Sequence, residues 1–107
     1  MIVCIPITTD GLVDPRWGRA DWVALADVND GKIVGWKEIE VSWSRLHDEG
    51  TEGSHHARVV RFLRDNHVET VVAHHMGDGM TRMLDTMGIP VHLGAAGEAK
   101  AAVLAAI

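Results

Sequence analysis

The sequence predicts a single α/β domain over residues 1–107, with a five-stranded mixed sheet and three helices in the order β-β-β-α-β-α-β-α. Three observations predict this class. Short apolar segments rich in β-branched residues recur between turn sequences, as buried strands do. Segments of the second half carry apolar residues at helical spacing. Helices that alternate with strands are typical of parallel strands joined by right-handed crossovers.

The first half of the chain is expected to supply three strands. Residues 2–7 form a short apolar segment that ends at a turn, and residues 8–20 form a loop containing Pro and Gly. Strands are predicted at 21–28 and 32–41. Asn29-Asp30-Gly31 separates them, and these residue types tolerate the positive φ of a tight turn. The two strands should therefore pair as an antiparallel hairpin.

The second half is expected to alternate between helices and strands. Val59, Val60, Phe62 and Leu63 fall on one helical face, and arginines occupy the other. The expected elements are a polar loop at 42–54, a helix capped by Ser54, a strand at 69–73, a short helix at 80–87, a strand at 89–93 and a final helix at 98–107.

Composition restricts the class of protein. Apolar residues make up 47% and charged residues 23% of the 107 residues, as in globular domains. The formal net charge of −5 disfavours a broad electrostatic contact with nucleic acid or an anionic membrane. No apolar segment approaches the roughly 18 residues of a membrane span. Cys4 is the only cysteine, which excludes an internal disulfide and suits a reducing compartment, so we expect a cytoplasmic protein.

Several short segments carry a family resemblance. They are Ile-Pro-Ile-Thr-Thr-Asp-Gly at 5–11, Trp-Gly-Arg-Ala at 17–20, the turn at 27–33, His-His-Ala at 55–57 and Gly-Asp-Gly at 77–79. In this order and spacing they resemble the small dinitrogenase iron–molybdenum cofactor biosynthesis family, over nearly the whole chain. The resemblance implies a ribonuclease H-like fold and the binding or carriage of metal–sulfur clusters. Iron–molybdenum cofactor is one such cluster, and the molybdenum–copper sulfide cluster of a relative called the orange protein is another.

Two histidine pairs are the main candidates for a metal site. His55 and His56 lie at the start of the first predicted long helix, and His74 and His75 lie at the end of the fourth predicted strand. In the implied fold these places share one sheet edge, where Thr8 and the neighbouring Asp10 would join them. Imidazole suits zinc, copper, iron and nickel. The free N–H groups of a helix start would favour an anionic ligand such as a thiomolybdate or a sulfide cluster.

Each histidine pair also has a second interpretation. His55 and His56 could be exposed first-turn residues, and we favour His56 as the ligand. Strand alternation sends His74 and His75 to opposite faces, so one of them could be packed or hydrogen-bonded. The family commonly carries small residues at this position, so a histidine pair there could change the ligand.

Other residues of the same sheet edge have candidate roles in binding an anion. Arg19 either neutralises an anionic cluster or pairs with Asp10 or Asp21. Gly77 and Gly79 serve turns and could let backbone N–H groups approach an anion. Trp17 either packs or covers a ligand. Cys4 within a predicted strand is expected to be a small buried apolar residue rather than a ligand.

These residues favour a non-enzymatic protein that binds or carries a metal–sulfur cluster. A protein that donates or accepts the cluster would be its partner, and edge strands could pair two copies as a homodimer. The alternative is a simple zinc-, copper- or protein-binding module. A nuclease-like hydrolase is disfavoured because such catalysis needs several carboxylates around divalent metals, and the first predicted strand contains none. Fold alone does not decide between these functions.

Overall fold

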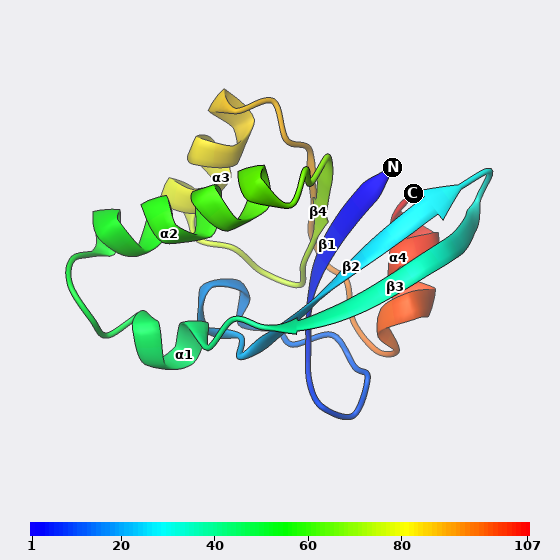
Figure 1. The fold of residues 1–107 in the computed structure, drawn as a ribbon, viewed down its shortest axis with the longest axis horizontal. Helices are drawn as coiled ribbons and strands as arrows, with labels where there is room; N and C mark the ends of the chain where they lie inside the picture. The colour runs from blue at the N-terminus through cyan, green and yellow to red at the C-terminus, as the bar shows by residue number, and fades with distance from the viewer.

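The computed structural model describes residues 1–107 and shows a twisted sheet with helices on both faces (Figure 1). The strand order is β3-β2-β1-β4-β5, with β1 at the centre. β1, β2 and β3 pair antiparallel, whereas β1, β4 and β5 pair parallel. This mixed five-stranded sheet is the ribonuclease H-like arrangement that the family resemblance implies. The strands are β1 (Ile2–Ile7), β2 (Trp22–Asn29), β3 (Lys32–Glu40), β4 (Thr70–Val72) and β5 (Val91–His92).

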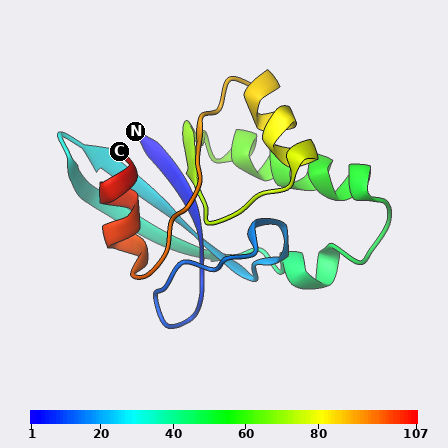
Figure 2. The same cartoon turned by 180° about the vertical axis from the view of Figure 1, so that it is seen from behind.

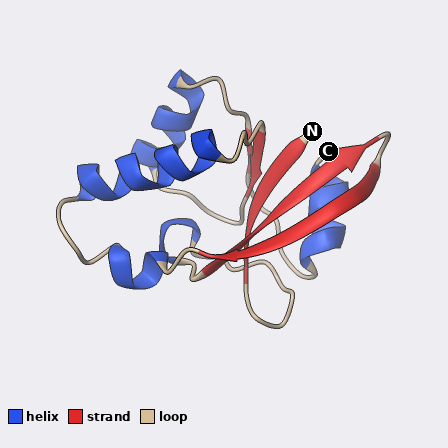
Figure 3. Ribbon diagram, viewed as in Figure 1, coloured by secondary structure: helices blue, strands red, loops and turns tan.

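Four helices and one 3-10 turn complete the fold, and Figure 3 distinguishes them from the strands and loops. The pattern of apolar residues predicts three of these helices. The fourth is a four-residue helix within the segment 42–54, which was expected to be a loop. The helices are α1 (Trp43–Leu46), α2 (Glu52–Asp65), α3 (Asp78–Thr86) and α4 (Ala99–Ala106), and the 3-10 turn is η1 (Trp17–Arg19).

The predicted hairpin of β2 and β3 is confirmed. Asp30 and Gly31 connect the strands with φ values of 51° and 75°, which side chains other than Asn, Asp and Gly rarely adopt. β1 pairs with β2 along its whole length, from Ile2 opposite Asp27 to Ile7 opposite Trp22. This long pairing places the carboxyl end of β1 next to the start of β2, close to η1.

The sheet separates two apolar cores. Cys4 of β1 faces α2 and α3, where it packs in the same cluster as Val59 and Leu63. Val3 and Ile5 face the opposite side, which α4 covers with Ala102 and Val103 among others. Figure 2 shows α4 apart from α2 and α3. β1 is therefore covered on both faces, as its unbroken apolar sequence predicts.

Trp43 explains why α1 forms where the sequence pattern indicates a loop. It is 2% exposed and packs edge-on against Trp17 and Phe62, with ring centroids 5.3 and 5.7 Å apart. Tertiary packing, rather than helical periodicity, therefore stabilises this short helix. Helix α2 begins at Glu52, and Thr51 is its cap because the Thr51 hydroxyl accepts the N–H of Ser54. Ser54 thus lies inside the first turn rather than at the predicted cap position.

The helices of this protein are all too short or too polar to cross a membrane.

Candidate functional site

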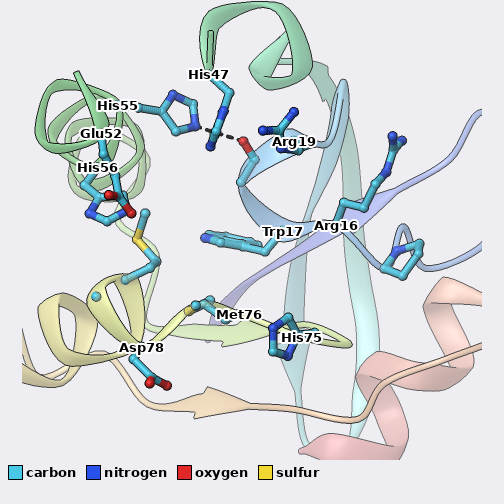
Figure 4. Close-up of a pocket in the computed structure, with 15 residues that line it drawn as sticks. Arg16, Trp17, Arg19, His47, Glu52, His55, His56, His75, Met76 and Asp78 are labelled. Carbon is cyan, nitrogen blue, oxygen red and sulfur yellow. Dashed lines mark hydrogen bonds and ion pairs between the residues drawn. The ribbon is translucent and has the colours of Figure 1, made fainter. Parts of the chain in front are cut away.

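A cleft of about 360 Å³ lies beyond the carboxyl end of β4 (Figure 4). Three separate parts of the chain line it. They are residues 15–19 around η1, residues between 47 and 56 at the start of α2, and residues 75–80 between β4 and α3. In sheets of this kind, ligands bind at the carboxyl ends of parallel strands, where the strand order changes direction. The cleft is therefore the candidate functional site.

His55 has a structural role in one wall of the cleft. Its side chain is buried, and its Nε2 lies 2.8 Å from the carbonyl oxygen of Gly18. Its Nδ1 lies 2.9 Å from the guanidinium of Arg58. Since Arg58 can only donate, Nδ1 accepts and Nε2–H donates, which describes a neutral imidazole. Burial lowers the pKa of His55 and favours the same neutral form. No lone pair remains for a metal, so the ligand role predicted for His55 does not fit this arrangement.

The ring nitrogens of His56 have no hydrogen-bond partner within the chain, and the same is true of His75, which also lines the cleft. Its side chain is 19% exposed, and its Nε2 lies 3.8 Å from the Glu52 carboxylate. Its ring lies directly over α3, because a Cβ built on Gly79 would come within 3.2 Å of the His56 Cε1. The absence of a side chain at Gly79 thus makes room for the imidazole, and a lone pair of His56 is available to a ligand.

His74 and His75 point to different parts of the molecule. His75 lines the cleft and is exposed. His74 places its Nδ1 3.1 Å from the carbonyl oxygen of Ala95, in the loop that precedes α4. Alternation along the extended chain separates the two imidazoles, as the sequence indicated. The cleft is therefore lined by both histidines of the first pair but only by His75 of the second, and His56 and His75 are the members of the two pairs whose ring nitrogens have no partner.

The structure does not bring Thr8 and Asp10 to the cleft. The Thr8 hydroxyl accepts the N–H groups of Asp10 and Leu12 at 3.3 Å, and so it organises a turn. That turn contacts the start of α4, where the carbonyl oxygen of Gly11 accepts the N–H of Ala99. Because the chain leaves β1 toward α4, the residues around η1 occupy the position that was expected for Thr8 and Asp10.

Two arginines near η1, Arg16 and Arg19, differ in how closely each contacts a carboxylate. Arg16 binds the buried carboxylate of Asp14, with 3.3 Å between Nε and Oδ1, and this hydrogen bond raises the pKa of Arg16. Figure 4 shows Arg16 extending away from His56. Arg19 is half exposed, and its nearest carboxylate, that of Asp48, is 4.0 Å away. Arg19 is therefore the more available of the two cations for an anion in the cleft.

Gly77 and Gly79 lie at the start of α3, on the floor of the cleft. Gly77 is the residue before the first turn, and no side chain caps the helix there. The N–H groups of Asp78, Gly79 and Met80 accordingly have no carbonyl partner. Free amides at a helix start are a favourable place for an anion. The roles predicted for both glycines fit this position.

Three further features of the cleft lie outside the set of metal and anion ligands that the sequence predicts. The indole Nε1 of Trp17 is buried and has no hydrogen-bond partner. Met76 and Met80 line the cleft and are each 4% exposed. The ring of His47 packs edge-on against His55 at 5.0 Å. The sequence predicts that Trp17 either packs or covers a ligand, that Met80 is a core residue, and that His47 lies in a mobile loop. Cys4, by contrast, is fully buried in the α2–α3 core and lies outside the cleft.

The chain holds no group of three or more His, Cys, Asp or Glu side chains arranged around a metal ion. What the cleft offers instead is the unpartnered imidazoles of His56 and His75, three backbone N–H groups, one buried indole N–H and Arg19, beside the imidazole of His47 and the carboxylates of Glu52 and Asp78. The amides, the indole and Arg19 suit a ligand that presents acceptor atoms on its surface.

Solved structures share this fold at low sequence identity. The crystal structure of PH0822 superposes with a TM-score of 0.78 at 20% identity, covering 98% of this chain and 87% of that chain. A putative NifB protein from Thermotoga, described as a member of the DUF35 family, gives 0.70 at 24% identity, with 95% and 83% covered. The apo form of the orange protein from Desulfovibrio gigas gives 0.75 at 20% identity, with 95% and 82% covered.

The TM-scores establish a common fold. No curated protein sequence matches the chain. The family model described as dinitrogenase iron-molybdenum cofactor matches residues 1–107, the whole length of the chain. The protein therefore belongs to the dinitrogenase iron–molybdenum cofactor family.

Proposed function

We propose that this protein binds a metal–sulfur cluster in the cleft and carries it as cargo, without catalysing a reaction. The observation that carries the proposal is the convergence of His56, His75 and the uncapped start of α3 on one cleft. Membership of a family named for the iron–molybdenum cofactor supports a cluster of that type. A molybdenum–copper sulfide cluster is the second type that the family resemblance implies. The solved structure of the orange protein, which shares the fold, is described as an apo form. The word apo implies that the orange protein also has a form with a bound group.

The donor set of the cleft suits an anionic cluster that must later be released. Sulfido groups on the surface of such a cluster would accept hydrogen bonds from the amides of α3 and from Arg19. His56 and His75 could each supply one imidazole to an exposed metal. The only thiolate source, Cys4, is fully buried, so the chain adds no strong sulfur ligand of its own. Few covalent contacts favour transfer to a partner protein.

Anaerobic reconstitution tests this proposal. The protein, purified without a histidine tag, is mixed with iron–molybdenum cofactor or with a molybdenum–copper sulfide cluster and then desalted. Bound metal, acid-labile sulfide and visible absorption are measured. The variant His56→Ala/His75→Ala should lose most of the bound cluster, and His74→Ala is the matched control because His74 contacts Ala95 outside the cleft. A colourless wild-type protein, or equal loading of all three proteins, would overturn the proposal.

A copper(I) site is the second candidate, because two thioethers line the same cleft. Met76 and Met80 are soft ligands, and soft ligands combined with imidazole favour copper(I). Copper(I) added without sulfide separates the two functions. Stoichiometric binding that is lost in Met76→Leu/Met80→Leu would support the copper site, whereas cluster uptake that survives in this variant would support the carrier.

A further inference from the structure

The indole of Trp17 points to a specific role for the cleft. Trp17 is 3% exposed, yet its Nε1 makes no hydrogen bond. Native proteins leave few buried donors without a partner, and each one calls for an explanation. Trp17 lines the cleft, and Figure 4 shows its ring directed toward the space between His56 and the start of α3. A ligand in the cleft could supply the missing acceptor.

The opposite side of that space presents a second set of donors. The N–H groups of Asp78, Gly79 and Met80 open the nine-residue helix α3 without a carbonyl or side-chain partner. The carboxylate of Asp78 points away from Trp17 (Figure 4), so it does not occupy these amides. An indole N–H on one side and helix amides on the other would surround a small anion with donors from two directions.

We propose that Trp17 donates its indole N–H to an anion bound at the start of α3, and that the anion presents oxo or sulfido acceptors, as a tetrahedral metal oxyanion or thioanion does. This inference rests on the proposed function and names the unit of the cargo that the cleft recognises. It assigns recognition to hydrogen bonds with the outer atoms of the anion, in addition to any imidazole contact from His56 or His75.

Access to the indole nitrogen requires a small movement of the cleft wall. The Nε1 atom has almost no exposed surface, so an acceptor reaches it only when a neighbouring side chain shifts. Met76 and Met80 line the same cleft, and the unbranched side chain of methionine changes rotamer readily. Ligand entry should therefore move at least one of these two thioethers.

Nuclear magnetic resonance on the wild-type protein tests the proposal directly. The four tryptophans give separate indole N–H signals, which are followed while tetrathiomolybdate, molybdate or phosphate is added without oxygen. We expect the indole signal of Trp17 and the amides of residues 78–80 to shift together. The indole of Trp36 donates to Glu38 at 2.9 Å on strand β3 and should not shift. The three anions distinguish a thioanion site from an oxyanion or phosphate site.

Calorimetry on variants gives the size of the effect. Trp17→Phe keeps an aromatic ring but removes the donor, and it should bind the effective anion about tenfold more weakly, the usual effect of losing a hydrogen bond to a charged group. Trp36→Phe is the control and should bind like the wild type. If Trp17→Phe does not fold, the wild-type titration alone decides the question.

The outcomes separate this inference from the proposed function. An unmoved Trp17 signal, or equal affinity of Trp17→Phe, overturns the inference, and cluster uptake by the wild type would then leave the carrier function standing. A shifted Trp17 signal without any cluster uptake supports the anion site and overturns the carrier function. If neither a shift of the Trp17 signal nor cluster uptake is observed, both proposals are overturned.

Discussion

The Nε2 of His55 and the carbonyl oxygen of Gly18 are 2.8 Å apart, although 37 residues separate them in the chain. This hydrogen bond joins helix α2 to turn η1, so it holds two walls of the cleft together. Arg58 completes the arrangement by donating to the other ring nitrogen. One histidine of the first pair therefore shapes the cleft, and its neighbour His56 faces the cleft with both ring nitrogens unpartnered.

Removing the His55 imidazole should destabilise the protein. His55→Ala leaves the carbonyl of Gly18 without its donor and opens a space in a buried region. We expect the free energy of unfolding to fall by about 2–3 kcal/mol. Urea denaturation followed by tryptophan fluorescence measures the change. His92→Ala, at an exposed position of β5, should change it by less than about 0.5 kcal/mol. A similar loss in both variants would contradict the structural role of His55.

The stability of the fold should decrease in mild acid. Burial lowers the pKa of His55, so the unfolded chain takes up its proton at a higher pH than the folded protein does. The unfolded state then binds more protons, and the free energy of unfolding falls as the pH drops below about 6.5. Urea titrations at pH 7.5 and pH 5 should show this loss.

The variant His55→Gln identifies the residue responsible for this pH dependence. Its amide can still donate to Gly18 but takes up no proton in this range. The difference in stability between pH 7.5 and pH 5 should therefore be smaller in His55→Gln than in the wild type. An unchanged difference would assign the acid sensitivity to other groups.

Gly79→Ala should separate stability from binding. Alanine favours the helix by about 1 kcal/mol over glycine, so the midpoint of thermal unfolding should stay equal or rise. The new Cβ would come within 3.2 Å of the His56 ring and displace it, so cluster loading should fall. Gly53→Ala, in the first turn of α2 and outside the cleft lining, is the matched control, because a Cβ there meets only the Thr51 hydroxyl at 3.9 Å. Full loading of Gly79→Ala would show that the position of His56 is unimportant.

Cys4 should be inert in the folded protein. Burial raises the pKa of its thiol, and none of its surface is exposed. A thiol reagent such as dithionitrobenzoate should react with Cys4 only after denaturant unfolds the chain. Cys4→Ala should load cluster as the wild type does, and a loss of loading without a loss of stability would make Cys4 a ligand after all.

The sequence predicts the sheet better than it predicts the cleft. Strands β1, β2 and β3 follow from their apolar pattern and from the turn at Asn29-Asp30-Gly31, because these signals are local. Helix α1 does not follow from a local pattern, since the tertiary contacts of Trp43 and the hydrogen bond from Arg58 to the carbonyl of Leu46 stabilise it. The sequence places the cap of α2 at Ser54, three residues after the actual cap Thr51. Both residues belong to one capping box, in which each side chain bonds to the backbone of the other.

The candidate site shows the same limit. Alternation along the chain anticipates that His74 and His75 point to different places. The hydrogen bond of His55 could not be anticipated, because its partner Gly18 is distant in sequence. The expected position of Thr8 and Asp10 rested on the end of β1, whereas the direction in which the chain leaves a strand depends on tertiary contacts with α4. The unpartnered nitrogen of Trp17 appears only in three dimensions.

The three segments that line the cleft meet only when the whole sheet has formed. Neither the hairpin of β2 and β3 nor the pair α2–β4 contains the cleft by itself. Cargo held there would bind the native state and not the unfolded chain, and so would raise the free energy of unfolding by an amount that grows with the logarithm of cargo concentration. At one hundred times the dissociation constant this is about 2.7 kcal/mol. If the protein holds such cargo, the loaded form would thus resist proteolysis better than the empty one.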